Sequence, residues 1–526
     1  MVKLKRRTPH LELNAEFTRA LDLMEHGDKS VFITGRAGTG KSTLLEHFRN
    51  ITTKKVAVLA PTGVAALNVR GQTIHSFFGF KPDITMEKVR KLRSGSRVKV
   101  YRELAAIVID EISMVRADLL DCVDRFLRLN GPDDGLPFGG IRMVFIGDLY
   151  QLPPVVTGAE KAIFNTIYDT PYFYSAKVFR SFETGFVELE KVYRQHDKDF
   201  IGLLNAVRNN SITEADLDRL NTRCLPDFEA PENDFYICLV TTNQMARDVN
   251  DRRLANLETP LHTFSANIQG GFGKEYLPTA IDLQVKVGSQ VMMLNNDASG
   301  RWVNGSVGKI VDIVSESNEA VIVVELQGGD TVDVTPHTWE VFRFYVDEGR
   351  LQSETLGSFV QYPLMLAWAV TIHKSQGKTF EKVIIDIGRG AFAHGQTYVA
   401  LSRCTTLEGI VLKRPILKKH VWTDYRICDF LTKYQYGKAE KACPVGDKSR
   451  LIEETIKERG LLEIVYLKPN DEKSKRIVRP LTIGEMEYQG KHYLGMRAFC
   501  TMRNEERTFR VDRILEIRRV PGLSGA

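Results

Sequence analysis

The sequence lacks the features of a disulfide-bonded or membrane-spanning protein. Its seven cysteines are scattered through 526 residues, and no two of them form a C-x-x-C pair. This argues against a disulfide framework or a structural zinc site and indicates a reducing compartment. No apolar run approaches the roughly 18 residues of a membrane span, and polar residues follow the basic start MVKLKRR where a signal peptide needs an apolar stretch. We therefore expect a soluble cytoplasmic protein with no membrane partner.

The chain also has little excess charge. Its 72 basic and 66 acidic residues give a formal net charge of +6, which by itself is too small to indicate a nucleic-acid-binding protein. From Asp447 to the end, however, there are 17 basic and 13 acidic residues, so this last part holds most of the excess. Apolar residues make up 43% of the chain and charged residues 26%, as in ordinary globular proteins, and the length predicts several domains.

Short apolar segments alternate with amphipathic helical stretches in two parts of the chain. The first part contains VFIT at 31–34, VAVLA at 56–60, AIVID at 106–110 and MVFIG at 143–147; the second contains FYICLVTTN at 235–243, MLAWAVT at 365–371 and VIIDIG at 383–388. Continuous apolar strands that are each followed by a helix predict parallel sheets covered on both faces. Residues 261–362 carry short alternating segments between Gly, Asn and Asp, which predict an all-β insert, and the tail from Arg450 has a β pattern again.

One Gly-rich segment predicts a nucleotide site. GRAGTGKS at 35–42 matches the phosphate-binding loop G-x-x-x-x-G-K-[ST] and stands between a predicted strand and a predicted helix. Its glycines let backbone N–H groups converge on phosphate oxygens, Lys41 reaches the β and γ phosphates, and the Ser42 hydroxyl ligates Mg²⁺. We therefore predict that ATP and Mg²⁺ are bound by Gly35, Ala37, Gly38, Thr39, Gly40, Lys41, Ser42 and Thr43.

Polar residues at the ends of two later strands complete this prediction. Asp110 and Glu111 follow the strand AIVID, where the first carboxylate reaches Mg²⁺ and the second polarises the attacking water. Gln151, in GDLYQLPPV, follows the next strand and is placed to sense the γ phosphate; the alternative is an ordinary loop glutamine.

These motifs resemble those of the superfamily-one helicases. Together with APTGVAAL, TIHSFFG, EISMV, VYRQ, TIHKSQGKTF and YVALSRC in this order, they are most similar to the Pif family of 5′-to-3′ DNA helicases over about residues 10–435. The resemblance implies an α/β fold with two RecA-like parallel-sheet motor domains, a small all-β barrel insert, and ATP in the cleft between the motor domains. The implied parts are domain 1A at 1–185 with a small wedge, 1B, at about 64–82, domain 2A at 186–260 and 363–436, the insert 2B at 261–362, and a linker at 437–449.

The resemblance also implies roles for residues outside the phosphate loop. Arg194 in VYRQ and Arg403 in ALSRC correspond to arginines that reach the γ phosphate, with surface arginines as the alternative, and Gly377 in KSQG lies at the same cleft. The glutamine that reads adenine in the family is missing here, and Asn14 is the residue that could take its role. The implied DNA-binding residues are Pro61, Thr62, Gly63, His75, His373, Lys374 and Ser375.

Three features of the motor region have other interpretations. His75 could be a hydrogen-bonded core histidine instead of a DNA contact. We expect Phe77, Phe78 and Phe80 to pack within the wedge. The roles of Trp302 and Asn304, at a turn of the insert, stay open.

The tail from about Arg450 to Val520 resembles a WYL domain, a small Sm-like β-barrel. The triplet that names the domain is His492-Tyr493-Leu494 here, so its tryptophan is absent, and Arg479-Pro480 also fits. Arg507 and Arg510 are the predicted contacts to phosphates of a single strand; the alternative is a solvated basic face that only docks on the motor.

The sequence therefore predicts an ATP- and Mg²⁺-dependent DNA helicase that moves 5′ to 3′ on single-stranded DNA. The expected partners are single-stranded DNA and DNA with a 5′ tail, and we expect a monomer in the bacterial cytoplasm, associated with the nucleoid. Two alternatives are an RNA or RNA–DNA hybrid helicase, and a ligand-responsive WYL regulator with an attached ATPase.

Overall fold

The computed structural model describes residues 14–81, 83–93, 96–156, 164–231, 234–316, 319–347, 350–388, 390, 393–488 and 490–520. The chain forms two compact units: Met1–Leu204 with Thr213–Val421, and Asn205–Ile212 with Trp422–Ala526. In these described ranges, no helix has the length and apolar character needed to span a bilayer.

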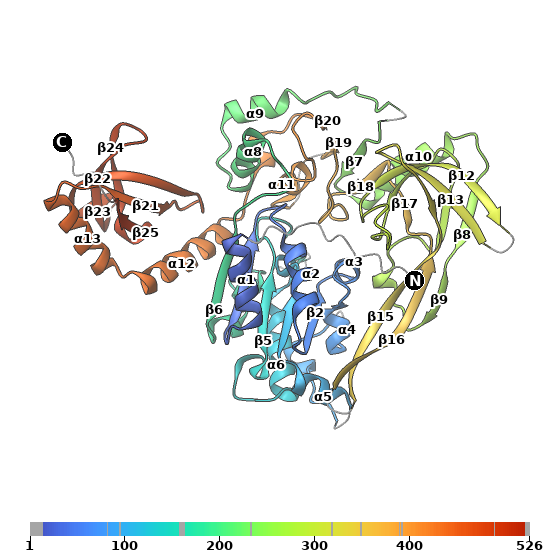
Figure 1. The fold of residues 1–526 in the computed structure, drawn as a ribbon, viewed down its shortest axis with the longest axis horizontal. Coiled ribbons are helices and arrows are strands. Elements are labelled where there is room, and N and C mark those ends of the chain that lie inside the picture. Colours follow the sequence, from blue (N-terminus) through green and yellow to red (C-terminus); the bar gives the residue numbers. More distant parts are fainter. Residues whose placement is uncertain are drawn as a thin grey trace, which may run out of the picture. The chain divides into compact units, whose positions relative to one another are not determined.

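A six-stranded parallel sheet forms the core of the N-terminal part of the chain (Figure 1). The strand order is β3-β2-β4-β5-β1-β6, and every neighbouring pair is parallel. The central strands are almost entirely buried, which explains why they read as continuous apolar runs. The strands are β1 (Ser30–Gly35), β2 (Val56–Ala60), β3 (Gln72–Thr73), β4 (Ala106–Ile109), β5 (Arg142–Ile146) and β6 (Thr184–Leu189). The helices of this region are α1 (Ala15–Glu25), α2 (Lys41–Ile51), α3 (Gly63–Asn68), α4 (Ile74–Phe78), α5 (Ser96–Glu103) and α6 (Ala117–Asn130).

A second parallel sheet has four strands in the order β18-β7-β19-β20. Its strands are β7 (Ile237–Val240), β18 (Ala369–Thr371), β19 (Val383–Asp386) and β20 (Ile410–Leu412). The helices that accompany it are α8 (Lys198–Arg208), α9 (Glu214–Asn221), α10 (Asn243–Ala255) and α11 (Gln396–Leu401).

Two of the expected boundaries need correction. The boundary drawn at 185/186 lies inside β6, which pairs with β1 from Thr184 to Leu189 and so belongs to the first sheet. The expected single strand at 365–371 is two strands: β17 (Leu364–Leu366) pairs with the insert, and β18 pairs with β7. The chain changes sheets between them, where Ala367 exchanges backbone and side-chain hydrogen bonds with Gln290.

The insert is built from antiparallel strands, as predicted. Its main sheet has the order β14-β13-β12-β11-β17, beside the pair β10-β8 and the three-stranded sheet β15-β16-β9. Trp302 is 6% exposed within the apolar core of the main sheet, which gives it a packing role. The strands are β8 (His262–Ser265), β9 (Asn267–Gly270), β10 (Asp282–Val285), β11 (Gln290–Met293), β12 (Val307–Glu316), β13 (Glu319–Leu326), β14 (Thr331–Val334), β15 (His337–Asp347) and β16 (Arg350–Gln361).

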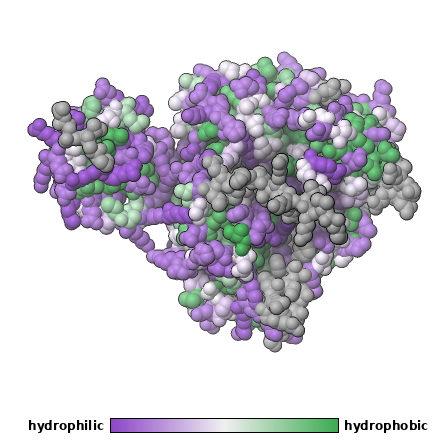
Figure 2. Space-filling view, viewed as in Figure 1, coloured by the Kyte–Doolittle hydropathy of each residue, from purple (hydrophilic) through white to green (hydrophobic). Residues whose placement is uncertain are grey.

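The second compact unit contains a five-stranded antiparallel sheet in the order β24-β23-β22-β21-β25. Its outer surface on the face seen in Figure 2 is largely hydrophilic. The linker expected at 437–449 is mostly helical: α12 (Tyr425–Ala442) runs through its first half, and α13 (Val445–Lys457) begins within it and packs on β22. The strands are β21 (Leu462–Leu467), β22 (Lys473–Tyr488), β23 (Lys491–Cys500), β24 (Glu505–Arg510) and β25 (Ile514–Arg519).

Candidate nucleotide and nucleic-acid site

The phosphate loop connects β1 to α2, as the sequence predicts. Gly38 and Gly40 have φ values of 79° and 87°, in the left-handed region that glycine adopts without strain. A Cβ on Gly38 would lie 2.6 Å from the Cβ of Arg194, so a larger residue would not fit there. The Lys41 ammonium donates to the carbonyl oxygens of Gly35 at 2.7 Å and Arg36 at 3.0 Å, so it folds back over the loop. Ser42 and Thr43 are exposed on the first turn of α2.

The two predicted acidic residues lie at the end of β4. Asp110 is 8% exposed, and Glu111 has a φ of 51°, which is uncommon for a residue with a side chain. Burial raises the pKa of both carboxyl groups, and the charge of Asp110 raises the pKa of Glu111 further. Two buried carboxyl groups side by side favour a cation between them and the phosphate loop.

These residues fit a Mg²⁺ that is bound together with a nucleotide. Mg²⁺ takes one or two protein ligands along with substrate phosphates, and Ser42 and Asp110 could supply the protein ligands. No cluster of three or more His, Cys, Asp and Glu that could hold a metal unaided occurs in the part of the chain that the structure describes. These two ligands therefore suit a metal ion that binds together with ATP.

Side chains from the second sheet reach this site. The Gln376 amide donates to Oε2 of Glu111 at 2.9 Å and to Oε1 of Gln151 at 3.1 Å. Gln151 is 5% exposed and also donates to Asp148 at 3.3 Å, so its side chain is held inside this site, and its contact with the γ phosphate stays a prediction. The Tyr398 hydroxyl on α11 accepts a 2.9 Å hydrogen bond from the backbone N–H of Ala37 in the phosphate loop.

The two predicted arginines both lie at the junction where residues of the two parallel sheets meet, but they lie in different environments. Arg194 is partly exposed and donates to the carbonyls of Ser402 at 3.1 Å and of Gly377 at 3.3 Å. Arg403 is 1% exposed, and among the residues that the structure describes its acceptors belong to its own domain, including the Val399 carbonyl at 2.9 Å. Burial lowers the pKa of Arg194 to about 10 and that of Arg403 to about 9, and the charge of Arg194 contributes to the second shift.

Asn14 has a structural role beside the phosphate loop. Its side-chain oxygen accepts from the Phe17 N–H at 2.8 Å and caps α1, and its amide donates to the Tyr193 hydroxyl at 3.2 Å. Phe17 and Tyr193 both lie within 4.0 Å of the position that a Cβ on Gly40 would take. Both the oxygen and the amide of the Asn14 side chain therefore already have hydrogen-bond partners within the protein. Recognition of adenine by this residue stays a prediction.

The predicted DNA-binding residues lie after β2 and β18. Thr62 caps α3 by accepting from the Ala65 N–H at 3.3 Å, Pro61 precedes it and is partly exposed, and Gly63 is buried. His75 on α4 and His373 are both partly buried, and burial lowers the pKa of each imidazole. Lys374 is exposed.

Ser375 differs from its expected position at the surface. It is 0% exposed, and its hydroxyl donates to the Ile372 carbonyl at 2.7 Å. The hydroxyl therefore closes the turn after β18 instead of facing solvent.

The aromatic residues of TIHSFFGF form a packed group, as expected, but they pack on α5 and α6 and not only within the wedge. Phe77 and Phe78 are 5% and 2% exposed, and their ring centroids are 4.9 Å apart. Phe78 stacks on Phe80 and on Tyr101, and Phe126 of α6 contacts the same group. These rings are a core that holds α4 against α6.

The predicted phosphate contacts of the tail are ion-paired. Arg507 bonds to Glu505 at 2.6 Å, and Arg510 bonds to Asp512 at 2.6 Å. The Arg510 guanidinium also lies 5.0 Å from the ring centroid of Tyr493. Each arginine therefore has a local carboxylate that a phosphate would have to replace.

Four residues of the junction were not among those predicted from the sequence: Asp148, Gln195, Gln376 and Tyr398. Asp148 follows β5 in the segment GDLYQ, and Gln376 stands within HKSQG, so both lie beside residues that were predicted. Gln195 stands next to Arg194 in VYRQ, and Tyr398 begins YVALSRC. Gln195 is 2% exposed and donates to the carbonyls of Ser402 and Cys404.

Comparison with known proteins agrees with this geometry. The PIF1-like helicase family model matches residues 13–218, and the WYL domain model matches residues 447–519. An ATP-dependent DNA helicase Pif1 from Bdellovibrio bacteriovorus is 35% identical over 416 residues, which cover 76% of this chain and 88% of the relative. The chain belongs to the PIF1-like helicase family.

Solved structures support the same assignment. A Bacteroides Pif1 in complex with ADP-AlF4 is 36% identical, with a TM-score of 0.74 over 80% of this chain and 97% of that one. A Bacteroides Pif1 bound to single-stranded DNA is 37% identical, with a TM-score of 0.58 over 80% and 96%. The chain spans about three fifths of the length of the vertebrate PIF1 relatives that it matches. The predicted family, the α/β fold with a C-terminal WYL domain, and the use of ATP and Mg²⁺ are confirmed.

Proposed function

We propose that this PIF1-like helicase moves 5′ to 3′ along single-stranded DNA and uses ATP hydrolysis to unwind duplex or structured DNA. The observation that carries the proposal is that one nucleotide site is built from both parallel sheets. Gln376, which follows β18, bonds to Glu111, which follows β4. A change of the nucleotide at such a site alters the contact between the two sheets, and that is the coupling a motor needs.

The residues of the site have distinct parts in hydrolysis. Lys41 can leave the Gly35 and Arg36 carbonyls to pair with the β and γ phosphates, and Arg194 can neutralise charge at the γ phosphate. Glu111 orients the attacking water, and Gln376 holds its carboxylate in place through an amide that also donates to Gln151. Ser42 and Asp110 would hold Mg²⁺, which would supply positive charge against the charge that develops on the phosphates.

The predicted DNA-binding residues are divided between the two parallel sheets, which supports a mechanism with two alternating grips. Thr62 begins α3 after β2, whereas His373 and Lys374 follow β18. If the sheets approach and separate as nucleotide turns over, each set of contacts holds the strand in turn. The direction of movement rests on family membership.

Strand displacement with ATP and Mg²⁺ tests the proposal, with matched duplexes that carry a 5′ or a 3′ single-stranded tail. We expect unwinding from the 5′ tail only, and none by the Lys41→Ala variant. Unwinding from the 3′ tail would contradict the direction. ATP hydrolysis that single strands stimulate, without unwinding of either duplex, would indicate a translocase that is not a helicase. Preference for an RNA strand in the same assay would favour the RNA or hybrid alternative.

Three finer points belong to the same proposal. We infer that the protein acts as a monomer, which light scattering with and without forked DNA would test. We infer that the WYL domain aids single-strand binding or regulates the motor. Association with the bacterial nucleoid in the cytoplasm follows from the proposed DNA substrate and would be tested by fluorescence microscopy of the tagged protein.

A further inference from the structure

Helix α11 accompanies the second sheet but begins against a segment of the first. All of its residues, Gln396–Leu401, are buried. The residue before it, Gly395, has a φ of 75°, and a Cβ there would lie 2.4 Å from the carbonyl oxygen of Gln151 and 2.5 Å from that of Tyr150. The start of α11 is therefore packed on the segment after β5 that contains the residue predicted to sense the γ phosphate.

The end of α11 is held by the chain that leaves β6. The carbonyl of Ser402, the C-cap residue, accepts from the Arg194 guanidinium at 3.1 Å and from the Gln195 amide at 3.2 Å. Both donors follow β6 of the first sheet, and Arg194 is the arginine predicted to reach the γ phosphate. Both ends of α11 are thus tied to residues beside the terminal phosphate of the predicted nucleotide.

Between these ends, one side chain of α11 bonds to the phosphate loop itself. The Tyr398 hydroxyl accepts from the Ala37 N–H at 2.9 Å, and the two residues are 4% and 6% exposed. A phenol hydroxyl is both an acceptor and a donor, and this bond uses its acceptor side only. The donor side can therefore serve a ligand that binds at the loop.

The charges near Tyr398 favour an anion as that ligand. Burial lowers the pKa of Arg194 and of Arg403, and Tyr398 is among the groups that oppose this shift in both, so it lies close to both guanidinium groups. The Lys41 ammonium bonds to the carbonyls of the two residues that precede Ala37 in the loop. An anion near three cationic side chains is stabilised, and the terminal phosphate of ATP is the anion that the sequence predicts there.

We propose that Tyr398 distinguishes ATP from ADP: its hydroxyl accepts from the Ala37 N–H and donates to an oxygen of the γ phosphate. The inference rests on the proposed function, and it adds a residue of α11 to those that contact the nucleotide. ADP has no γ phosphate, so this bond forms with ATP only and is lost when the cleaved phosphate leaves. The position of α11 then depends on which nucleotide is bound.

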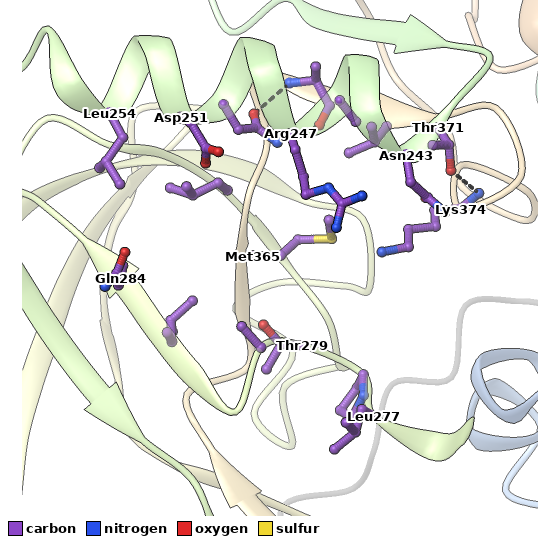
Figure 3. A pocket seen from close by; sticks show the side chains of 18 of the residues that line it. Asn243, Arg247, Asp251, Leu254, Leu277, Thr279, Gln284, Met365, Thr371 and Lys374 are labelled. Atoms are coloured by element: carbon purple, nitrogen blue, oxygen red, sulfur yellow. Dashed lines mark hydrogen bonds between the residues drawn. The ribbon is translucent and has the colours of Figure 1, made fainter. Parts of the chain in front are cut away.

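A short route connects α11 with a predicted DNA contact. Lys374 follows β18 and lines a groove of about 540 Å³ beside α10 (Figure 3). The carbonyl of the next residue, Ser375, accepts from the Arg403 guanidinium at 3.3 Å, and Arg403 follows the end of α11 by two residues. One hydrogen bond therefore connects the segment after α11 with the turn that carries Lys374.

The test is titration of the full-length protein, with Mg²⁺, with fluorescent ADP and with a fluorescent non-hydrolysable ATP analogue. We expect Tyr398→Phe to raise the Kd of the ATP analogue by about ten- to a hundredfold, the effect of losing one hydrogen bond to a charged group. The Kd of ADP should stay within about threefold of wild type, since ADP offers this hydroxyl no acceptor. Phenylalanine keeps the ring, so the substitution removes only the hydroxyl.

Tyr101→Phe is the matched control. The Tyr101 hydroxyl is also buried, and it donates to the Phe77 carbonyl at 2.7 Å within the aromatic group beside α6. We expect wild-type Kd values for both nucleotides from this variant. The thermal midpoint of each variant shows whether it is folded.

The outcomes separate this inference from the proposed function. An equal loss of affinity for ADP and for the ATP analogue in Tyr398→Phe would show that the hydroxyl only supports the phosphate loop, and would overturn the inference. Wild-type affinity for both nucleotides would overturn it too, and so would the same selective loss in Tyr101→Phe. The proposed function fails separately, if the wild-type protein does not unwind the duplex with a 5′ tail.

Binding of a fluorescent oligo(dT) tests the route from α11 to the DNA contacts. With saturating nucleotide, we expect the Kd of oligo(dT) for the wild-type protein to differ between the ATP analogue and ADP. Tyr398→Phe, saturated in the same way, should show a smaller difference. An undiminished difference would contradict transmission through Tyr398, and no difference in the wild type would overturn both this route and the two alternating grips.

Discussion

The side-chain amide of Gln376 donates a 2.9 Å hydrogen bond to the carboxylate of Glu111. The two residues are 265 positions apart in the sequence and belong to different parallel sheets. Glu111 is the residue expected to orient the attacking water, and Gln376 stands next to Gly377, whose carbonyl accepts from Arg194. The turn that follows β18 in the second sheet therefore contacts the carboxylate of Glu111 directly.

Replacement of Gln376 by Leu should lower the rate of ATP hydrolysis without preventing nucleotide binding. Leucine cannot donate to Glu111 or Gln151, so both side chains lose the group that positions them. A charge-assisted hydrogen bond contributes about 1.5–3 kcal/mol, which corresponds to a fall in turnover of about ten- to a hundredfold. The measurements are steady-state hydrolysis with single-stranded DNA and titration with a fluorescent ATP analogue.

Gln327→Leu is the matched control for this prediction. The Gln327 amide also donates to a glutamate, Glu381, at 2.9 Å, but on the exposed surface. We expect wild-type hydrolysis from that variant. Unchanged hydrolysis in Gln376→Leu would mean that the bond to Glu111 has no part in the reaction.

Arg194 and Arg403 should respond differently to replacement by Ala. Arg403 is buried and bonds to the backbone carbonyls of Val399, Ser375 and Lys378, so its replacement removes three hydrogen bonds from the interior of the domain. Each such hydrogen bond contributes about 0.5–1.5 kcal/mol, and we expect a fall in thermal midpoint of several degrees. Arg194 is partly exposed beside the phosphate loop, so Arg194→Ala should lower turnover by about 10³-fold with a shift of about 2 °C or less.

Differential scanning fluorimetry together with DNA-stimulated hydrolysis separates the two arginines. Arg403→Lys is informative here, because it keeps a positive charge but cannot reproduce the planar fork of hydrogen bonds. If Arg403→Ala retained the wild-type midpoint and lost only turnover, Arg403 would act on the γ phosphate and not as a support for its own domain.

Much of the nucleotide site could be predicted because its residues are local in the sequence. The phosphate loop and the pair Asp110-Glu111 each directly follow an apolar strand, and the carboxyl ends of parallel strands meet at one edge of the sheet. The contacts of Gln376 and Tyr398 with the first domain could not be predicted in this way. They depend on how two separate sheets approach each other, and no spacing within either motif encodes that.

The fold, like the site, could be predicted only in part. Most strands of the two parallel sheets were predicted from apolar runs, but β3 and β6 were not, and the division of residues 364–371 into β17 and β18 was missed. Both strands are apolar and nearly contiguous, so composition does not indicate that one pairs with β11 and the other with β7. The helical character of 437–449 was missed because Pro444 and the surrounding polar residues suggest a linker, whereas Pro444 precedes the first turn of α13.

Replacement of both Arg507 and Arg510 by Ala should change single-strand binding less than the basic tail suggests. Each guanidinium already has a carboxylate partner, Glu505 or Asp512, so a phosphate gains little when it displaces that partner. We expect a Kd within about threefold of wild type. The slope of log K against log[salt] should change by less than the contribution of one phosphate contact. A tenfold loss of affinity, with an unchanged thermal midpoint, would instead assign the two arginines to the strand-binding surface.

Lys378 should make the stability of the motor unit depend on pH in the alkaline range. Its ammonium donates to the side chain of Asn304, which also donates to Asn68 at 3.0 Å, and burial lowers the pKa of Lys378 to about 8 from an ordinary value of 10.5. Between these two values the unfolded chain binds more protons than the folded one, so the free energy of unfolding rises with pH. Below pH 8 the lysine is charged in both states and this contribution is absent.

We expect the free energy of unfolding of the wild type to gain about 1–3 kcal/mol relative to Lys378→Met between pH 7.5 and 10, measured by urea unfolding. Lys374→Met, which removes an exposed ammonium four residues away, is the control; the same gain relative to that variant would show that the effect does not come from the buried lysine.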